Sequence, residues 1–556
     1  MNGIIAAGGE HTVNAGAYIL QKGGNAVDAA IAATFASFVS EVGVVHLGGS
    51  GFANIYDSQN GRSLVYDFFS AMPGLEGNKH SDKSLDFNSV EVDFGSSKQS
   101  FFVGRASVAV PGNIAGLCQM AADHGRLPLE ILLEPAISLA TDGISIAKFQ
   151  ADTCKLLGPI FTHTPEMQEI FAPNGHIVKS QEFFKIPGLA FSLEQLAQEG
   201  VKYARRENWT TLVNNKLFRN HGLAYKFIND QRQNGGLIRA LDLVSYNVFR
   251  FPSIRISYRE YEILLPPPCS TGGILTAFSL NLLNRINFKN VEFGSVQHAQ
   301  IFREVMAATL RARPYWDNAI GKRSVSEAIA YFLSNNFINR FFNEIKHALI
   351  NNKPTSVVQE SNGAGNTSHL SVIDKDGLAV SITTTAGETA GFIVPETGFI
   401  PNNILGESDL NPNGFHNWEP GVRIPTMMSP TIVLKSGVPF LVVGSGGSER
   451  IRSAIIQVLI NYLDFKMSLN EAVNAPRFHL DATSAENSGS KIQAVLQCEF
   501  GFQEEILNQL ENIGYDVNRW PVRSIYFGGA HSVSRTADGR LVAAGDNRRG
   551  GATAVA

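Results

Sequence analysis

Hydrophobic residues recur at helical spacing through much of the first 350 residues of the chain. Residues 12–42 predict two Ala-rich helices, since a Gly-Gly pair can stop the first and Asn25 can cap the second. Residues 52–69 predict a β-hairpin around an Asn-Gly turn. The other segments with helical spacing are 112–122, 127–140, 150–250, 274–284 and 296–346.

Strand spacing dominates after residue 366. Residues 351–366 have neither period and predict a flexible linker, while residues 75–100 are polar and irregular. The pattern predicts an α/β sandwich with mixed strands, because strand pairs flank helical layers. Strands are predicted at 107–110, 258–265, 369–374, 378–385, 391–394, 429–435, 439–443, 524–527, 531–535 and 540–544, and late helices at 449–463 and 468–474.

The composition is that of a well-buried globular protein. Hydrophobic residues make up 44% of the 556 residues and charged residues 17%, which excludes a disordered chain. The formal net charge is −4 without blocks of like charge, so we expect no nucleic-acid partner and no membrane partner. Four widely spaced cysteines favour core positions over a disulfide framework or a metal site: Cys118, Cys154, Cys269 and Cys498.

No segment predicts a membrane span or a secretory leader. The longest apolar stretch, from Ala29 to Val39, contains Thr and Ser and is well short of a span. The first eight residues are too short and too uncharged for a signal peptide. We therefore expect a soluble, cytoplasmic protein, unless a leader was removed before the numbered chain.

Common nucleotide and metal motifs are missing from the sequence. The Gly-Lys pair at 321–322 lacks the Ser or Thr of a phosphate-binding loop, and the glycine runs at 48–51 and 444–447 lack the G-x-S-x-G spacing. We expect no metal and no cofactor. The histidines are scattered, and we expect structural roles for His369, His416, His479 and His531.

A threonine opens a predicted strand at the end of the linker. Residues 362–374 read Asn-Gly-Ala-Gly-Asn-Thr-Ser-His-Leu-Ser-Val-Ile-Asp. A backbone cut before Thr367 would leave a hydroxyl and a free α-amine on one residue, which together supply a nucleophile and its base. On this stretch alone, a loop that merely enters a strand is the simpler interpretation.

Three separated stretches resemble the γ-glutamyltranspeptidase family of N-terminal-nucleophile hydrolases. They match the family's opening helix, its processing site with the first catalytic strand, and its glycine-rich site loop. The order and spacing of the motifs carry the resemblance across nearly the whole chain. The matching stretches are 21–30, 366–377, and 428–433 with 444–451, and residues 266–273 and 475–478 also fit.

The resemblance implies a precursor that cuts itself between Asn366 and Thr367. We expect Asn366 to be exposed, because glycines flank it and flexible linkers tolerate backbone cuts. Residues 1–366 would form a large subunit and residues 367–556 a small catalytic subunit, interlocked in one four-layer αββα sandwich. The subunits of one precursor would thus be each other's partners, with no conventional domain boundary between them.

The resemblance also implies roles for individual residues. Thr367 would be the nucleophile, with its own α-amine as the base. Thr385, eighteen residues on, would hold that nucleophile in place. The backbone N–H groups of Gly447 and Ser448 would form the oxyanion hole, although a tight strand-to-helix turn also explains the glycines there.

The sequence departs from the family where a substrate's head group would bind. Phe69 occupies the position of the arginine that grips the glutamyl α-carboxylate. Thr426 and Met427 replace a pair of serines, and Gly387 replaces an asparagine. A bidentate arginine–carboxylate contact is worth about 1.5–3 kcal/mol, so its loss weakens recognition of that carboxylate.

A second departure lies in the run that begins at Asn402. Asn403 is kept and Glu407 can serve as the amine-binding acid, but Ile404 replaces a polar residue. We expect Phe69, Asn403, Glu407, Thr426 and Met427 to line the substrate site. Three arginines could replace the missing one from another direction: Arg105, Arg423 and Arg450.

The sequence as a whole predicts a self-processing enzyme that transfers a γ-glutamyl group to water or an amine. Glutathione is the usual donor of the family that it resembles. Two alternatives stay open: an acylase of the same fold that cleaves another side-chain amide, such as a glutaryl amide, and an unprocessed, inactive binding or scaffold protein.

Overall fold

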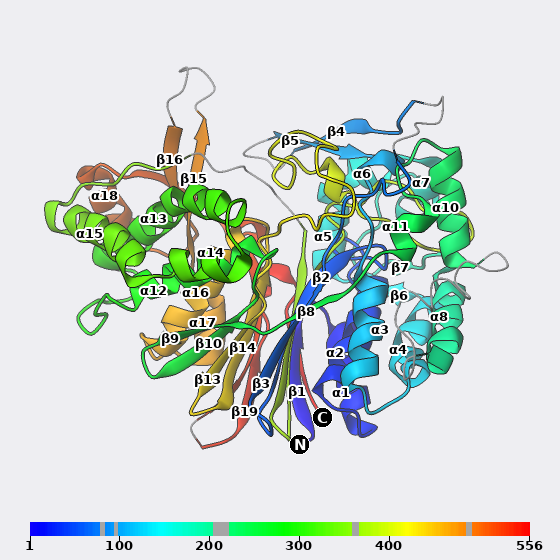
Figure 1. Cartoon of the computed structure of the whole chain (residues 1–556), viewed down its shortest axis with the longest axis horizontal. Helices are drawn as coiled ribbons and strands as arrows, with labels where there is room; N and C mark the ends of the chain where they lie inside the picture. The colour runs from blue at the N-terminus through cyan, green and yellow to red at the C-terminus, as the bar shows by residue number, and fades with distance from the viewer. Residues whose placement is uncertain (78–83, 94–97, 204–221, 359–365, 485–491, 537) are drawn as a thin grey trace.

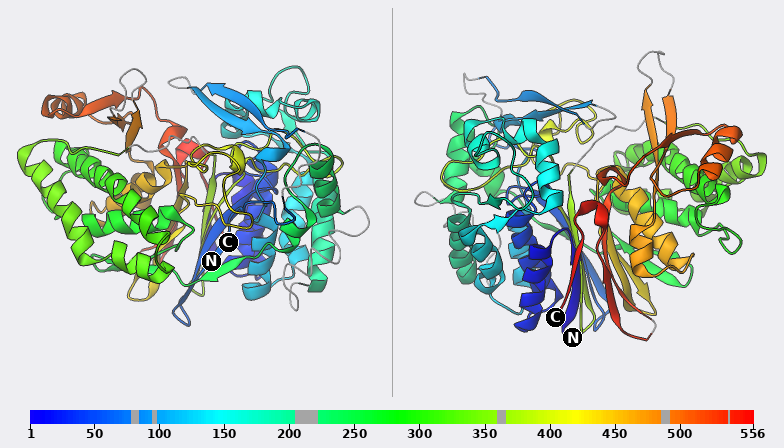
Figure 2. Two further views of the ribbon diagram at one scale, coloured as in Figure 1. Left: turned by 45° about the horizontal axis from the view of Figure 1, so that its top comes forward. Right: turned by 180° about the vertical axis from the view of Figure 1, so that it is seen from behind.

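Two facing β-sheets form the centre of the molecule, and helices cover the outer face of each (Figures 1 and 2). The computed structural model describes residues 1–77, 84–93, 98–203, 222–358, 366–484, 492–536 and 538–556. The layers follow the order helix, sheet, sheet, helix, which confirms the predicted αββα sandwich. The two chain ends lie side by side at one edge, where the Ala556 N–H donates to the Gly3 carbonyl at 3.0 Å.

The first sheet carries the predicted hairpin and the strand that follows Thr367. Every pairing described within it is antiparallel. Its strand order is β20 (Ala552–Val555), β1 (Gly3–Ala7), β11 (Ser368–Asp374), β12 (Leu378–Thr385), β2 (Ser50–Asp57), β3 (Arg62–Phe68) and β8 (Phe249–Phe251).

The second sheet is also antiparallel in every described pairing. The prediction of mixed strands is therefore wrong for both central sheets: hairpins join β11 to β12, β2 to β3, β9 to β10, β13 to β14 and β18 to β19, and the remaining neighbours, which are distant in sequence, also pair antiparallel. The strand order is β19 (Leu541–Ala544), β18 (Gly529–Arg535), β14 (Val438–Gly446), β13 (Thr431–Lys435), β10 (Tyr261–Leu265) and β9 (Ile254–Tyr258).

Helices from the first half of the chain lie on the outer side of the first sheet (Figure 1). The predicted helix pair near the N-terminus packs directly on this sheet. The helices of this side are α1 (Glu10–Gln21), α2 (Ala26–Ser40), α3 (Asn113–His124), α4 (Leu129–Asp142), α5 (Lys148–Leu156), α6 (Gly158–Phe161), α7 (Pro165–Phe171), α8 (Leu189–Tyr203), α10 (Leu223–Gln233) and α11 (Ala240–Val244).

Helices from the middle and the end of the chain lie beyond the second sheet. They are α12 (Thr271–Leu283), α13 (Val296–Ile320), α14 (Val325–Phe332), α15 (Asn335–Asn351), α16 (Arg450–Leu463), α17 (Leu469–Asn474) and α18 (Glu504–Ile513). Among the described residues, three small sheets complete the fold: β4 (Asn88–Asp93) with β5 (Lys98–Val103), β6 (Ile144–Ser145) with β7 (Phe183–Phe184), and β15 (Phe478–Ser484), β16 (Ile492–Cys498) and β17 (Asp516–Arg519).

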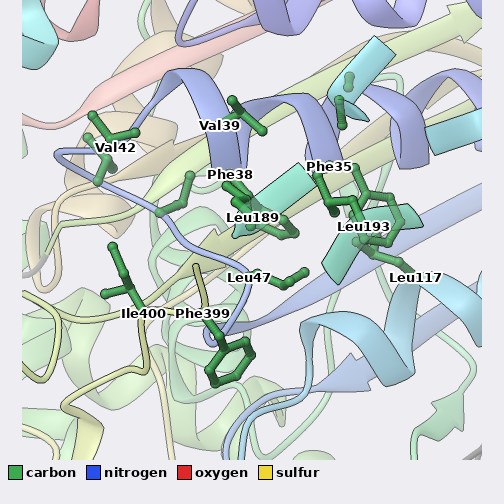
Figure 3. Packing of buried hydrophobic residues seen from close by; sticks show 14 of the residues in the cluster. Phe35, Phe38, Val39, Val42, Leu47, Leu117, Leu189, Leu193, Phe399 and Ile400 are labelled. Atoms are coloured by element: carbon green, nitrogen blue, oxygen red, sulfur yellow. The ribbon is translucent and has the colours of Figure 1, made fainter. Parts of the chain in front are cut away.

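Helix α2 is buried along its whole length between the first sheet and neighbouring helices (Figure 3). The Asn25 side chain accepts hydrogen bonds from the Val27 and Asp28 amides, which confirms the predicted cap. Asp374 at the end of β11 accepts a bond from the Ala26 amide at 2.9 Å. This contact ties the start of α2 to the strand that begins just after Thr367.

Four local predictions are wrong. Residues 391–394 form no strand, and residues 524–527 contain a 3-10 turn. The predicted strand at 107–110 is also absent, since Ser107 ends another 3-10 turn, Arg105–Ser107. The stretch 75–100, predicted as irregular, contributes strand β4 and part of β5. These segments are short, so contacts with distant parts of the chain decide their conformation more than their own pattern does.

Candidate active site

Asn366 and Thr367 lie inside the molecule, and Thr367 lies against Gly446 of the second sheet. The two residues are 4% and 5% exposed. The expectation that Asn366 would be exposed is therefore wrong, because hydrogen bonds from several segments draw it inward. Residues 359–365 of the predicted linker lie outside the described part of the chain.

The backbone carbonyls of these two residues are held by a hydroxyl and a guanidinium, respectively. The Thr385 hydroxyl, at the end of β12, donates to the Asn366 carbonyl. The Gly387 amide donates in turn to the Thr385 oxygen at 2.9 Å. Arg549 donates to the Thr367 carbonyl at 3.3 Å. The carbonyl that precedes Thr367 thus faces a donor hydroxyl, as a carbonyl poised for nucleophilic attack requires.

Glu388 is a site residue that sequence reasoning missed. Its carboxyl accepts hydrogen bonds from the Asn366 backbone amide at 3.1 Å and from the Asn366 side-chain amide at 2.7 Å. Burial raises the pKa of Glu388 to about 8, against the opposing charge of Arg549. The sequence signal that could have found it is an acid three residues after Thr385, next to Gly387, which replaces an asparagine of the family.

The start of β11 is held from the first helical layer. The Ser368 hydroxyl donates to Glu41 at 2.6 Å, and Thr12 donates to the other oxygen of that carboxyl at 2.6 Å. Burial raises the pKa of Glu41. His369 sits between the sheets, 2.9 Å from the hydroxyls of Thr383 and Ser371. These contacts fix where Thr367 leaves the strand.

A close approach by β14 completes the wall beside Thr367. A Cβ atom on Gly446 would lie 2.0 Å from the Thr367 carbonyl oxygen, so only glycine fits there. Gly447 has a φ of +121°, and Ser448 has a φ of +47°. Helix α16 begins two residues after Ser448, so the predicted strand-to-helix turn is confirmed.

A cavity of about 690 Å³ opens from Thr367 toward helices α13 and α14. It brings together most of the residues predicted for the substrate site. Gly447 and Asn403 are not among its lining residues; the Asn403 side chain instead accepts a bond from the Glu388 amide at 2.7 Å. The predicted residues that line the cavity are Thr367, Thr385, Phe69, Glu407, Thr426, Met427 and Ser448.

Two buried carboxyls in this cavity each keep an unused oxygen. Oε1 of Glu407 and Oδ1 of Asp409 have no hydrogen-bond partner among the described residues. Ser448 donates to the other Asp409 oxygen at 2.8 Å. Burial raises the pKa of Glu407 well above its usual range, and the charges of Asp409 and Glu388 raise it further. Burial also raises the pKa of Asp409.

The opposite wall of the cavity is apolar. Phe69 is fully buried and lies 6.3 Å from Phe52 between ring centres. Met427 is 7% exposed, and Ile404, which is fully buried, also lines the cavity. The other apolar side chains that line the cavity include Trp316, Ile320, Leu410, Trp418 and Ile451.

None of the three arginines proposed as replacements lines this cavity. Arg105 pairs with Asp230 at 3.2 Å, and Arg423 pairs with Asp67 at 3.2 Å. Arg450 donates to the Tyr526 carbonyl at 3.2 Å. Among the described residues, the arginine that does line the cavity is Arg313, which sequence reasoning missed.

Arg313 reaches the cavity from helix α13, far along the chain from the motifs around Thr367. Its guanidinium lies 3.1 Å from a Glu449 oxygen, in a pair whose Glu449 side chain is buried. Arg313 is therefore already paired with a carboxylate of the protein, and it does not directly replace the arginine whose position Phe69 occupies.

No group of three or more His, Cys, Asp or Glu side chains suited to a metal ion occurs within the described ranges. The same ranges contain no helix that is both long and apolar enough to cross a membrane.

Comparison with known proteins assigns the chain to a family. A family model described as gamma-glutamyltranspeptidase matches residues 12–556. The chain belongs to the gamma-glutamyltranspeptidase family. The resemblance seen in the separate sequence motifs is thus confirmed over nearly the whole length.

Relatives within the gamma-glutamyltranspeptidase family have two kinds of name. The glutathione hydrolase proenzyme of Escherichia coli (strain K12) is 30% identical over 574 aligned positions, covering 98% of this chain and 90% of that protein. The acylase ACY 1 proenzyme of Pseudomonas sp. (strain SE83) is 30% identical over 538 positions, covering 95% and 89%. Identity alone therefore does not choose between a hydrolase of glutathione and an acylase.

A solved cephalosporin acylase from Bacillus halodurans has the same fold. It superposes with a TM-score of 0.79 over all of this chain and 95% of that one, at 22% identity. The likeness supports the four-layer architecture of this gamma-glutamyltranspeptidase-family enzyme.

Proposed function

We propose that this protein is a self-processing acyl-transfer enzyme in which Thr367 is the nucleophile. The observation that carries the proposal is the arrangement around one peptide bond. Thr367 lines the cavity, and the carbonyl before it accepts a hydrogen bond from the Thr385 hydroxyl. A loop that merely enters a strand has no need of a buried, polarised carbonyl beside a cavity.

Self-cleavage would begin with attack of Thr367 Oγ on the Asn366 carbonyl carbon. The C–N bond breaks, and the proton from Oγ ends on the departing nitrogen, which becomes the α-amine of Thr367. Water then opens the resulting ester, which leaves a carboxylate on Asn366 and returns the hydroxyl to Thr367. The products are residues 1–366 and 367–556, interlocked because β11 and β12 lie between strands of the large subunit.

The mature enzyme would use the same hydroxyl on a substrate amide. The α-amine of Thr367 takes the Oγ proton as the acyl group is transferred, and then gives it to the leaving amine. Water or a second amine next releases the acyl group from the ester. We assign the negative oxygen of each tetrahedral step to the N–H groups of Gly447 and Ser448, where such donors contribute about 3–4 kcal/mol.

We propose a γ-glutamyl amide as the acyl donor, with weak recognition of its α-carboxylate. Glu407 supports this choice, since it lines the cavity and its carboxyl can accept a hydrogen bond from the substrate amine. Glutathione is the obvious first donor to test, in view of the name of the Escherichia coli relative.

A second candidate is an acylase that cleaves a different side-chain amide. The observation that favours it is the apolar wall formed by Phe69, Met427 and Ile404, which offers no partner to a charged head group. The acylase name of the Pseudomonas relative is consistent with this candidate.

Two anilides that differ only by the α-amine separate the candidates. The processed enzyme is mixed with γ-glutamyl anilide or glutaryl anilide, and release of aniline is followed together with the mass of the small subunit. We expect a transient acyl adduct on residues 367–556 and a modest preference for γ-glutamyl. A clear preference for glutaryl would favour the acylase, and the absence of any adduct on Thr367 would contradict the mechanism.

A further inference from the structure

The carboxyl of Glu388 grips the residue on the acyl side of the bond that we propose is cut. One oxygen accepts from the Asn366 backbone amide at 3.1 Å, and the other accepts from its side-chain amide at 2.7 Å. The same side-chain amide also reaches the Gly43 carbonyl at 3.4 Å. Within the described residues, both hydrogen bonds of this carboxyl go to Asn366.

The loop that carries Glu388 is shaped to bring this grip and the Thr385 hydroxyl to the same residue. Gly387 has a φ of +63°, and a Cβ atom there would lie 2.1 Å from Glu407 Oε1 and 2.2 Å from Asn403 Oδ1. A glycine is therefore required at the turn. The Glu388 amide donates to Asn403 at 2.7 Å, which fixes the position of the acid.

A carboxylate suits this position better than any neutral side chain. Asn366 presents two N–H donors, and an ionised carboxyl offers two acceptor oxygens for them. A glutamine would offer one acceptor, and its own amide group would face a donor. Burying an acid here costs free energy, which the charge of Arg549 offsets only in part, since the pKa of Glu388 is still raised. Such a shift is typical of acids at functional sites.

We propose that Glu388 is a positioning residue for self-cleavage, which holds Asn366 at two points so that its carbonyl faces both the Thr385 hydroxyl and Thr367 Oγ. This inference rests on the proposed self-cleavage and adds a residue to it. Glu388 touches neither the attacking oxygen nor the carbonyl, so it acts through Asn366.

The hold of Glu388 on Asn366 should depend on pH. Three charged groups face Glu388: Arg549, which favours its ionised form, and Asp409 and Glu407, whose charges oppose it. Because burial raises the pKa of Glu388 to about 8, the acid is mostly protonated at neutral pH. The protonated carboxyl has an O–H donor facing a donor of Asn366, so one of the two hydrogen bonds is weakened. The hold of Glu388 on Asn366 therefore strengthens as pH rises through about 8.

Cleavage of newly made precursor tests this inference. The full chain is synthesised with labelled methionine in a cell-free system, diluted into buffers from about pH 6.5 to 9, and sampled on denaturing gels. We expect wild-type cleavage to accelerate about thirtyfold across this range, following the ionised fraction of one group with a pKa of about 8. Glu388→Gln should cleave about tenfold or more slowly at high pH, as expected for a lost charge-assisted hydrogen bond, and should lose the pH dependence.

The matched control is Glu396→Gln, the same substitution at a nearby acid whose side chain is 80% exposed and paired with Lys226. It should cleave like wild type at every pH. A third variant, Asn366→Ala, removes only the side-chain half of the grip and should slow cleavage less than Glu388→Gln does. Combined with Glu388→Gln, it should add less than its separate effect, because both changes remove the same contact.

Wild-type kinetics and an unchanged pH profile in Glu388→Gln would overturn the inference. If that variant fails to fold, as judged by its melting curve, Asn366→Ala decides the matter: unchanged cleavage there would also overturn it. Cleavage of Thr367→Ala would instead contradict the proposed self-cleavage itself, so the two failures are distinguishable.

Discussion

The two ends of the cavity differ in how their polar groups are satisfied. At Asn366 and Thr367, every carbonyl and amide discussed above has a partner on the protein, supplied by Thr385, Glu388 and Arg549. Elsewhere in the cavity lining, Glu407 keeps an oxygen that no described residue satisfies, and Phe69 and Met427 offer apolar surface. We propose that the protein alone holds the groups around the cleaved bond, whereas a bound substrate supplies the missing partner at the recognition end.

This contrast supports the proposal that the enzyme keeps the family's chemistry and differs in how it recognises the acyl head group. A buried oxygen without a partner costs about 1–3 kcal/mol, which a donor on the substrate would recover. Under this proposal, Phe69 and Met427 change the recognition end and leave the groups around Asn366 and Thr367 in place. Changes at the bond-breaking end should therefore abolish both cleavage and turnover, and changes at the recognition end should shift KM.

The largest effect is expected for Thr367→Ala. The variant should remain a single chain, and amide hydrolysis should fall by roughly 10⁶-fold, the scale of removing a covalent nucleophile. Thr367→Ser, which keeps a hydroxyl, is the control and should still be cut. Residual cleavage before residue 367 in the alanine variant, seen by intact mass, would break the assignment.

A smaller but still large effect is expected for Thr385→Ala. Without the hydroxyl that donates to the Asn366 carbonyl, self-cleavage should slow by about 10²–10³-fold, as for loss of one oxyanion donor. A pulse-chase gel gives the rate, with Thr385→Ser as the control that keeps the donor. Equal rates for the alanine variant and wild type would show that this hydrogen bond has no part in the reaction.

Glu407→Gln tests the recognition end. Its KM for γ-glutamyl anilide should rise about 10–100-fold, because the substrate ammonium favours the ionised form of Glu407 and the variant loses that charge-assisted hydrogen bond. The value of kcat should change little, since the bond is present in both ground and transition states. Glutaryl anilide lacks the amine and should be unaffected; a parallel loss with both substrates would place Glu407 outside amine recognition.

The smallest effect is expected for Met427→Ala. The apolar wall should lose roughly one methylene's worth of contact with the acyl chain, which raises KM about fourfold for glutaryl anilide. Met427→Leu keeps the apolar volume and should behave like wild type. A fall in KM for γ-glutamyl anilide in the alanine variant would indicate that Met427 obstructs the head group and does not contact it.

Much of the site could be predicted because its residues sit in local patterns. Thr367 and Thr385 open one strand and end its neighbour, so a hairpin register brings them together. Glu407 was found through its place in a run that resembles the family's. Strand spacing after residue 366 was likewise strong enough to give both strands of that hairpin.

The rest depends on contacts between distant segments. Arg313 enters the cavity from a helix with no motif of its own, and Glu41 reaches Ser368 across 327 positions of sequence. Asn366 was expected to be exposed because glycines surround it, yet its side chain and backbone are bound by Glu388. Local composition reports how a segment behaves alone and does not report the partners that bury it.

The mass of the purified wild-type protein tests the central claim most directly. Intact-mass spectrometry under denaturing conditions should show two chains, residues 1–366 and residues 367–556, and sequencing of the smaller chain should begin Thr-Ser-His. A single chain of 556 residues after prolonged incubation at pH 8–9, or a cut at any other bond, would contradict the account.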